Sequence, residues 1–204
     1  MSDKTIAKSL SVLFHPIAYP TYGFLLLLFF DSQFVIRIND QAKWYILVLV
    51  FINTFILPVA LLFILKKRGI VSSLKVENRE ERFYPLLIGL LFYATTWYLI
   101  SRLPLPSVYS YILSLSVILA ILAIIINVFF KISLHSMGAA AFSSALLVIS
   151  YKYNLQITAT IIVVFLISGL LASSRLVLKE HKPSQVYMGL IIGFLSGFFG
   201  LFLL

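Results

Sequence analysis

The sequence predicts an all-α membrane protein, a polytopic bundle of about seven transmembrane helices in one integral membrane domain, residues 1–204. Two observations predict this fold class. Of the 204 residues, 61% are hydrophobic and 11% are charged, whereas an average soluble domain has about 25% charged residues. The hydrophobic residues also form runs of about 17–25 residues, the length of a membrane-spanning helix. Because lipid offers the backbone no hydrogen bonds, such runs are expected to be helical.

The candidate spans differ in regularity, and their prolines predict where helices break. Pro16 and Pro20 interrupt the first run, directly after His15. Pro58 lies inside the second run, where we expect a kink because proline has no backbone N–H to donate. The predicted spans are about Leu10–Phe30, Trp44–Leu65, Tyr84–Ile100, Val108–Phe130, Ser133–Tyr151, Leu155–Ala172 and Val186–Leu204.

Small residues predict which helices form the packed centre of the bundle. The seventh span carries Gly189, Gly193 and Gly197 at four-residue spacing, and the fifth begins with the run Gly138–Ala141. Small residues at this spacing let helix backbones approach closely in lipid. We therefore expect the fifth and seventh spans to pack against each other.

The basic residues predict the orientation of the chain in the membrane. With seven spans, twelve of the sixteen lysines and arginines fall on the side of the N-terminus and four on the other. Since positive loops stay in the cytoplasm, we expect a multi-pass protein of the cell inner (plasma) membrane with a cytoplasmic N-terminus and an outer C-terminus. This bias also explains the net charge of +9 without a nucleic-acid partner.

Composition excludes several kinds of chemistry. The chain has no cysteine, so disulfides, thiolate catalysis and zinc–thiolate sites are excluded. The N-terminal segment "MSDKTIAKSL" lacks a small-residue cleavage site after a short apolar core, and we expect no removable signal peptide. The sequence indicates no oligomeric state.

A first polar cluster, "KVENREERFYP", follows the second span. On a helix, Lys75, Arg79 and Arg82 would share one face, with Lys75 and Arg82 about 10.5 Å apart along the axis. Such a basic edge can hold a phosphate, arginine through its planar fork and lysine as a point charge. The alternative interpretation is a solvated juxtamembrane segment of mixed charge.

A second polar cluster, "KISLHSMGAAAF", opens the fifth span. Ser133 is placed to cap the helix, and His135 would stand in its first turn. A helix N-terminus accepts phosphate through its unpaired N–H groups, and a histidine there is placed to protonate a leaving oxygen. The alternative interpretation is a histidine that only reaches toward the membrane interface.

A third polar cluster, "SSRLVLKEHKPSQVYMGL", joins the last two spans. Arg175 ends the sixth span, and His181 precedes the seventh, where Pro183 fits the first helical turn. Gln185 is one turn beyond His181, so its side chain could reach the imidazole and set its tautomer. The alternative interpretation is a charged loop between helices.

Topology allows the three clusters to meet. Two helical hairpins, spans three and four and spans five and six, separate them, and each hairpin returns the chain to the same side of the membrane. One lysine, two arginines and two histidines at one interface are what phosphoryl transfer to a histidine nucleophile requires. His15 is also on this side; it could line the same site, although a place in the headgroup region is the favoured interpretation.

The three clusters resemble the signature of the type-2 phosphatidic acid phosphatase superfamily of membrane lipid phosphatases: K-x6-R-P, then P-S-G-H, then S-R-x5-H-x3-D. The motifs occur in the same order, and the third matches best. The resemblance covers roughly residues 66–204 and implies a six-helix phosphatase-like core, with the irregular first helix outside it. The matching residues are Lys75 and Arg82, Ser133 and His135, and Ser174, Arg175 and His181.

The resemblance implies a role for each residue. His181 would attack phosphorus and form a phosphohistidine, His135 would protonate the leaving group, and Gln185 would orient His181. It implies no metal and no other cofactor, and the partners would be a phosphorylated lipid substrate and the surrounding membrane lipids. The phosphate-binding residues would be Lys75, Arg82, Ser133 and Arg175.

Several positions depart from the signature. Ile132 and Leu134 stand where the second motif has proline and glycine, Pro85 comes two places late, and Gln185 replaces the aspartate of the third motif. Glutamine can accept a hydrogen bond from imidazole but has no charge to stabilise imidazolium. In the serine-protease triad a comparable Asp→Asn change lowers the rate about 10⁴-fold. Glu180 or Glu81 could supply the missing charge.

Three functions are open at this stage. The first is dephosphorylation of a membrane lipid phosphate or prenyl (pyro)phosphate on the cytoplasmic side. The second is a family member without hydrolysis that binds a phosphorylated lipid, an alternative suggested by Gln185. The third is a small transport or assembly protein whose interfacial charges are structural. The sequence does not indicate which lipid or head group is bound, or whether phosphate or pyrophosphate is removed.

Overall fold

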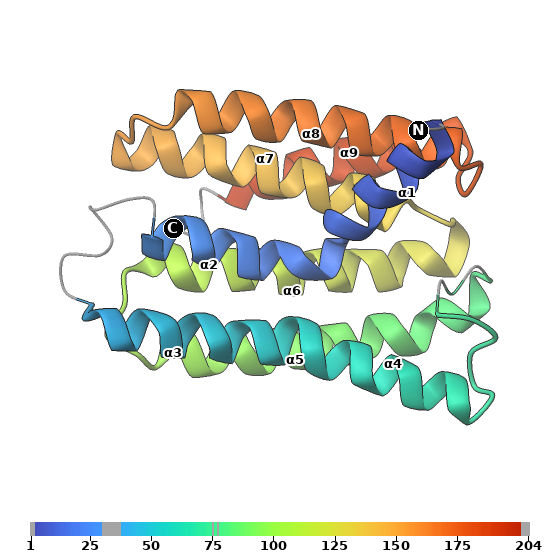
Figure 1. Ribbon diagram of the computed structural model, residues 1–204, viewed down its shortest axis with the longest axis horizontal. Helices are drawn as coiled ribbons and strands as arrows, with labels where there is room; N and C mark the ends of the chain where they lie inside the picture. The colour runs from blue at the N-terminus through green and yellow to red at the C-terminus, as the bar shows by residue number, and fades with distance from the viewer. Residues whose placement is uncertain (1–2, 30–37, 75, 77, 201–204) are drawn as a thin grey trace. The chain divides into compact units, whose positions relative to one another are not determined.

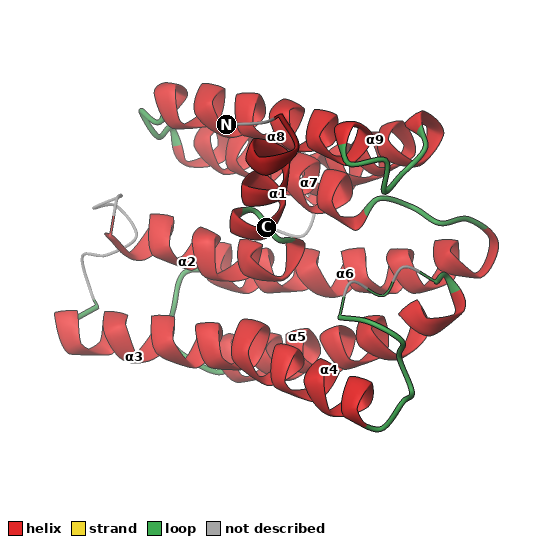
Figure 2. Ribbon diagram, turned by 45° about the vertical axis from the view of Figure 1, so that its right-hand side comes forward, coloured by secondary structure: helices red, strands yellow, loops and turns green. Residues whose placement is uncertain are grey.

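The computed structural model describes residues 3–29, 38–74, 76 and 78–200, and the regular structure within these ranges is helical (Figures 1 and 2). Six helical segments are long and apolar enough to cross a membrane, and a shorter apolar helix follows them. The polytopic helical bundle expected from the sequence is confirmed. The six segments are Asp3–Phe29, Asp40–Lys67, Glu80–Ser101, Ser107–Phe129, Leu134–Tyr153 and Thr158–Val177, and the shorter helix is Pro183–Phe199.

The helices fall into two compact units. Unit one combines the N-terminal segment Met1–Tyr19 with the C-terminal segment Ile125–Leu204, and unit two is Pro20–Ile124. The N-terminal segment therefore packs with helices more than one hundred residues away along the chain. Membership of both units in a single membrane domain stays a prediction, as does the extent of the phosphatase-like region, residues 66–204.

Unit one is built around one central helix. Its elements are α1 (Asp3–Leu13), the short 3₁₀ helix η1 (Pro16–Ala18), α7 (Leu134–Tyr153), α8 (Thr158–Val177) and α9 (Pro183–Phe199). The largely buried α7 packs against α9, α8 and η1, and α1 packs against α8. In Figure 1, α7, α8 and α9 run side by side, and α1 lies across them.

Glycines set the distance between α7 and α9. A methyl group on Gly189 would lie 2.7 Å from the carbonyl oxygen of Ser133, and one on Gly193 would overlap the carbonyl of Met137. One on Gly197 would overlap the Ser144 hydroxyl. Three successive turns of α9 thus rest directly on the α7 backbone, which confirms the close packing predicted from the small-residue spacing.

The predicted break in the first span is present. Helix α1 ends at Leu13, His15 is extended (φ −66°, ψ 136°), and Pro16 opens η1. The helix starts at Asp3 rather than at the predicted Leu10, so that prediction is wrong. Ala7 and Ser11 form a narrow buried stripe, whereas the charged residues of α1 stay exposed. Because only this stripe is apolar or small, a search for continuous apolar runs does not detect α1.

Unit two contains the remaining helices. Within it, α2 lies against α6: the rings of Phe24 and Tyr109 are 5.3 Å apart, and the Tyr109 hydroxyl donates to the carbonyl of Leu27 at 3.3 Å. The elements are α2 (Tyr19–Phe29), α3 (Asp40–Phe51), the π-helical segment η3 (Ile52–Ile56), α4 (Leu57–Lys67), the 3₁₀ turn η4 (Glu80–Arg82), α5 (Phe83–Ser101) and α6 (Ser107–Phe129), whose last turn belongs to unit one.

The irregularity expected at Pro58 takes the form of a π-helical turn. Residues Ile52–Ile56 precede the proline, and the N–H of Leu57 donates to the carbonyl of Ile52, five residues back. Proline has no N–H to continue the α-helical pattern. The wider turn lets the backbone reach new partners before the helix resumes as α4.

Helix α8 lies later in the sequence than predicted. The expected range was Leu155–Ala172, but Asn154 ends α7 in the left-handed conformation (φ 51°), and α8 runs from Thr158 to Val177. Its last turn includes Arg175, which is only 6% exposed. A buried, ion-paired arginine can continue a membrane helix that hydropathy alone would end sooner.

Candidate active site

The second polar cluster is fixed by the cap of α7. The hydroxyl of Ser133 accepts a hydrogen bond from the N–H of Ser136 at 3.4 Å and lies 2.9 Å from the Ser136 hydroxyl. The N–H of Ser133 donates to the carbonyl of Gln185 at 3.1 Å. Ser133 is therefore the predicted N-cap, and its backbone joins the start of α7 to the start of α9.

His135 stands in the first turn of α7, half-buried, and one of its ring nitrogens is engaged by the N-terminal segment. Its Nε2 atom lies 3.0 Å from the carbonyl oxygen of Ser11. A carbonyl oxygen only accepts hydrogen bonds, so Nε2 carries the proton. The Nδ1 atom of His135 is then the one that can take up or release a further proton.

A tight turn after α8 shapes the third cluster. Lys179 has a left-handed backbone (φ 54°), and the N–H of Glu180 donates back to the carbonyl of Arg175 at 3.3 Å. This hydrogen-bond pattern is the usual C-terminal stop of a helix. It folds Glu180 over the helix end, where its carboxylate forms an ion pair with the buried guanidinium of Arg175.

His181 is held by the side chain one helical turn later. The His181 Nδ1 atom lies 2.9 Å from Gln185 Oε1, which also accepts the N–H of Lys182 at 3.2 Å. Because Oε1 is an acceptor, Nδ1 of His181 carries the proton and Nε2 keeps its lone pair. The hydrogen bond that the four-residue spacing predicts is thus present, and His181 is only 8% exposed.

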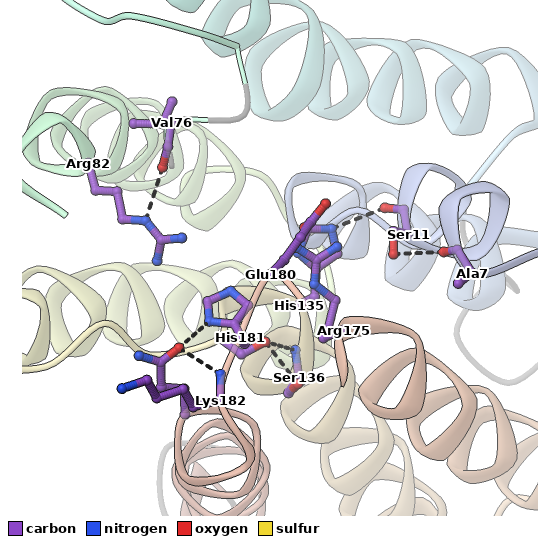
Figure 3. Close-up of polar contacts among 12 residues, drawn as sticks. Ala7, Ser11, Val76, Arg82, His135, Ser136, Arg175, Glu180, His181 and Lys182 are labelled. Carbon is purple, nitrogen blue, oxygen red and sulfur yellow. Dashed lines mark hydrogen bonds and ion pairs between the residues drawn. The ribbon is translucent and has the colours of Figure 1, made fainter. Parts of the chain in front are cut away.

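The second and third clusters come together within unit one. His135 interacts electrostatically with Arg175, with His15 and with His181, and His15 also interacts with Arg175. Figure 3 draws His135, Arg175, Glu180 and His181 as one group at the ends of α7 and α8 and the start of α9. The structure therefore brings together a buried cation and two histidines, each with one ring nitrogen engaged.

His15 also belongs to this group, although the interpretation favoured from the sequence placed it in the headgroup region. Its ring lies edge-on to the ring of His135, with the centroids 5.0 Å apart. The three sequence motifs gave no reason to include His15 in the site, because none of them covers the N-terminal segment. The signal that could have found it was its place at a proline break on the same side of the membrane as the other histidines.

The first polar cluster belongs to unit two. A helix was expected there, but the structure shows turns. Val76 is left-handed (φ 46°), and the chain from Gly69 to Arg79 forms turns and bends where it is described. The expectation of one helical face shared by Lys75, Arg79 and Arg82 is wrong, because a left-handed residue interrupts the helix. Lys75 lies outside the described residues, and the Nε–H of Arg82 donates to the carbonyl of Val76 at 3.2 Å.

The two glutamates suggested as substitutes for the missing aspartate have other partners. Glu81 accepts hydrogen bonds from the N–H and the hydroxyl of Ser72, at 2.8 and 2.9 Å, and from Asn78 at 2.9 Å. It closes the loop before α5. Glu180 pairs with Arg175, and the neutral Gln185 takes the place beside His181. Within the described residues, no three histidine, aspartate or glutamate side chains are grouped to hold a metal ion.

Comparison with protein families places this geometry in a known context. Residues 127–203 match the model of the PAP2 superfamily. The type-2 phosphatidic acid phosphatase superfamily, which the sequence motifs resemble, is therefore also the family to which this part of the chain is similar. PAP2 proteins are generally phosphatases, which supports a hydrolase that acts on lipid phosphates. Searches of curated proteins and of solved structures found no match.

The PAP2 match covers less than half of the chain and lies inside unit one. It includes the second and third clusters, with Ser133, His135, Arg175, His181 and Gln185, whereas Lys75 and Arg82 precede it. The family match therefore covers the same segment in which the two histidines and the buried arginine meet. The individual roles of all these residues stay predictions.

Proposed function

We propose that the chain hydrolyses a membrane lipid phosphate or a prenyl (pyro)phosphate through a phosphohistidine on His181. One observation carries the proposal: in the PAP2-matched segment, a buried histidine donates through Nδ1 to Gln185, so Nε2 is the ring nitrogen that carries the lone pair. His135 interacts electrostatically with both Arg175 and His181, and the proposal assigns His135 the role of acid and Arg175 that of the phosphate-binding cation.

In the first step, the Nε2 lone pair of His181 attacks phosphorus while the bond from phosphorus to the lipid oxygen breaks. The electron pair of that bond stays on the lipid oxygen, which takes the Nδ1 proton of a protonated His135 and leaves as an alcohol. A phosphorylated leaving group would leave in the same way from a pyrophosphate. The guanidinium of Arg175 would stabilise the negative charge on the phosphoryl oxygens.

In the second step, water attacks the phosphohistidine. The now neutral His135 accepts a proton from the water at Nδ1, the phosphorus–nitrogen bond breaks, and its electron pair returns to Nε2 of His181. Phosphate leaves, and both histidines are back in their starting protonation states. The Gln185 oxygen accepts a hydrogen bond from the Nδ1–H of His181 throughout, so the same nitrogen is presented in each cycle.

The rest of the phosphate clamp is proposed from the resemblance. Lys75 and Arg82 would add charge from the loop before α5, and Ser133 would act through the capped start of α7. In the cytoplasmic orientation proposed from the basic residues, the substrate would be a newly made phosphorylated lipid of the inner leaflet.

Alanine at Arg82 is expected to raise the KM for lipid phosphate more than it lowers kcat.

The test is phosphate release by purified protein in detergent from a panel of phosphatidic acid, lysophosphatidic acid, and prenyl phosphates and pyrophosphates. His181→Ala should lower release by at least about 10³-fold, and the wild-type protein should show an acid-labile phosphate label that is absent from His181→Ala. Lys152→Ala, an exposed change at the far end of α7, is the control. A folded protein that releases phosphate from no member of the panel would rule the proposal out.

The neutral Gln185 favours one further candidate, a PAP2 protein that binds a phosphorylated lipid without turnover. With a neutral amide rather than a carboxylate hydrogen-bonded to His181 Nδ1, the imidazolium formed during attack is less stabilised. This candidate predicts retained lipid phosphate in the purified protein, no phosphate release, and loss of binding in Arg175→Ala. Turnover by the unmodified protein would exclude it.

A further inference from the structure

The segment Ser11–Tyr19 is built onto one face of α7, beside His135. A methyl group on Gly138, three residues after His135, would lie 3.1 Å from the Tyr19 ring and 3.2 Å from Pro16. One turn further along the same face, the rings of Tyr19 and Phe142 are 5.2 Å apart. The absence of a side chain at Gly138 therefore lets the broken first span approach α7 next to the histidine.

Two groups of this segment contact the His135 imidazole from different directions. The Ser11 carbonyl, near the end of α1, lies 3.0 Å from Nε2. The ring of His15 lies edge-on at 84°, with the ring centroids 5.0 Å apart. One contact fixes which nitrogen carries the proton, and the other restricts rotation of the ring (Figure 3 shows the first).

The His15 ring is itself held in place. Its Nδ1 accepts a hydrogen bond from the N–H of Ile17 at 3.4 Å and so caps η1, while Pro16 limits the backbone that follows. Yet His15 stays exposed. A residue that served only as core packing would be buried, and capping alone would be served as well by asparagine or serine.

We propose that His15 is a positioning residue for His135: it holds the His135 ring with Nε2 on Ser11 and Nδ1 directed to the phosphoryl leaving group. This inference rests on the proposed function. It adds to the site a residue from the N-terminal segment, which lies outside the PAP2-matched region. Small displacements of a catalytic group cost large factors in rate, so a restraint on His135 affects turnover more than substrate binding.

Two variants separate the ring of His15 from its capping nitrogen. His15→Asn keeps a side-chain acceptor for the Ile17 N–H but removes the ring, and His15→Phe keeps a ring but removes the acceptor. We expect His15→Asn to lower kcat roughly ten-fold with KM within two-fold. We expect His15→Phe to keep kcat within three-fold while its melting temperature falls. Val12→Ala is the control, because Val12 lies on α1 with 70% of its surface exposed.

A spectroscopic readout makes the test independent of activity. The chain has three histidines, so nitrogen NMR of protein labelled at histidine resolves a small set of rings in detergent micelles. At a pH at which both rings are neutral, His135 should be protonated at Nε2 alone and His181 at Nδ1 alone. His15→Asn should convert the His135 signals to a mixture of both tautomers and leave His181 unchanged, whereas His15→Phe should preserve both.

The outcomes distinguish this inference from the proposed function. If the wild-type protein is active and His15→Asn changes neither kcat nor the His135 tautomer, the positioning role is wrong and the proposed function stands. If no lipid phosphate is hydrolysed but His15→Asn still mixes the His135 tautomers, the hydrolase proposal fails and the restraint on His135 is supported. Equal losses of kcat in His15→Asn and His15→Phe, with unchanged tautomers, would indicate a purely structural residue and overturn the inference.

Discussion

At the scale of single residues, the site is defined by which hydrogen bonds its histidines make. His181 donates through Nδ1 to a glutamine oxygen, and His135 donates through Nε2 to a backbone carbonyl. Each contact fixes which ring nitrogen carries the proton and which carries the lone pair. A neutral acceptor is sufficient to select a tautomer, but it stabilises positive charge on the ring less than a carboxylate does.

Gln185→Glu should therefore raise kcat by about five- to ten-fold. Glutamate has the same length as glutamine, so the 2.9 Å contact to His181 is kept, and a hydrogen bond to a charged group is worth about 1 kcal/mol more than one between neutral groups. The measurement is steady-state hydrolysis of the best substrate of the panel. A negative charge in the first turn of α9 also favours the helix.

Gln185→Leu is the matched loss-of-function variant for this prediction. It removes both the acceptor of His181 and that of the Lys182 N–H, so kcat and thermal stability should fall together. If Gln185→Glu were slower than the unmodified protein while equally stable, the orienting role given to residue 185 would be wrong.

At the scale of elements, the site depends on the contact between α7 and α9. The cap of α7 donates to Gln185 at the start of α9, and glycines along α9 rest on the α7 backbone. The second and third clusters are thus kept in register by helix packing together with the cap residue Ser133 and the turn at Lys179. A change in the packing distance would displace His135 relative to His181.

Gly193→Ala should destabilise unit one by about 3 kcal/mol, the upper range for overpacking, because its methyl group would overlap the backbone carbonyl of Met137. In a chain of this size that corresponds to a fall in melting temperature of roughly 6–12 °C, measurable by thermal unfolding in detergent. Activity should fall with it.

Gly169→Ala is the control on α8. A methyl group there meets no atom within 4 Å, and alanine favours a helix over glycine by up to about 1 kcal/mol, so stability should stay equal or rise. Equal melting temperatures for the two alanine variants would show that α9 does not rest on α7 as described.

At the scale of the whole molecule, orientation in the membrane decides which leaflet supplies the substrate. The distribution of lysine and arginine predicts that the N-terminus and the three polar clusters face the cytoplasm. Among the described residues, six helical segments long and apolar enough to cross a membrane and one shorter apolar helix indicate a multi-pass protein. The predicted orientation is open to a direct test because the chain has no cysteine.

Single cysteines at exposed positions should report that orientation. Lys152→Cys, at the end of α7, should react with a membrane-impermeant maleimide on intact cells, and Lys66→Cys, at the end of α4, should react only after permeabilisation. The cysteine-free parent is the background. The opposite labelling pattern would place the site on the outer face and remove the newly made inner-leaflet lipid as the proposed substrate.

The sequence alone determined the class of fold and most of its elements. Apolar runs of spanning length leave few alternatives in lipid, and proline fixes where such a run breaks, as at Pro16 and Pro58. The Gly189, Gly193 and Gly197 stripe identified the α7–α9 packing, and the spacing of His181 and Gln185 identified their hydrogen bond. These features are local, so they can be deduced from neighbouring residues.

Only the tertiary structure decided which residues far apart in the sequence lie next to each other. It placed Ser11 and His15 against His135, paired Glu180 with Arg175, and replaced the expected helix before Arg82 with turns around a left-handed Val76. Such contacts depend on how whole helices pack and on backbone conformations that no periodicity encodes. A lone histidine at a helix break has no pattern in sequence, and its role is defined only by the ring it touches.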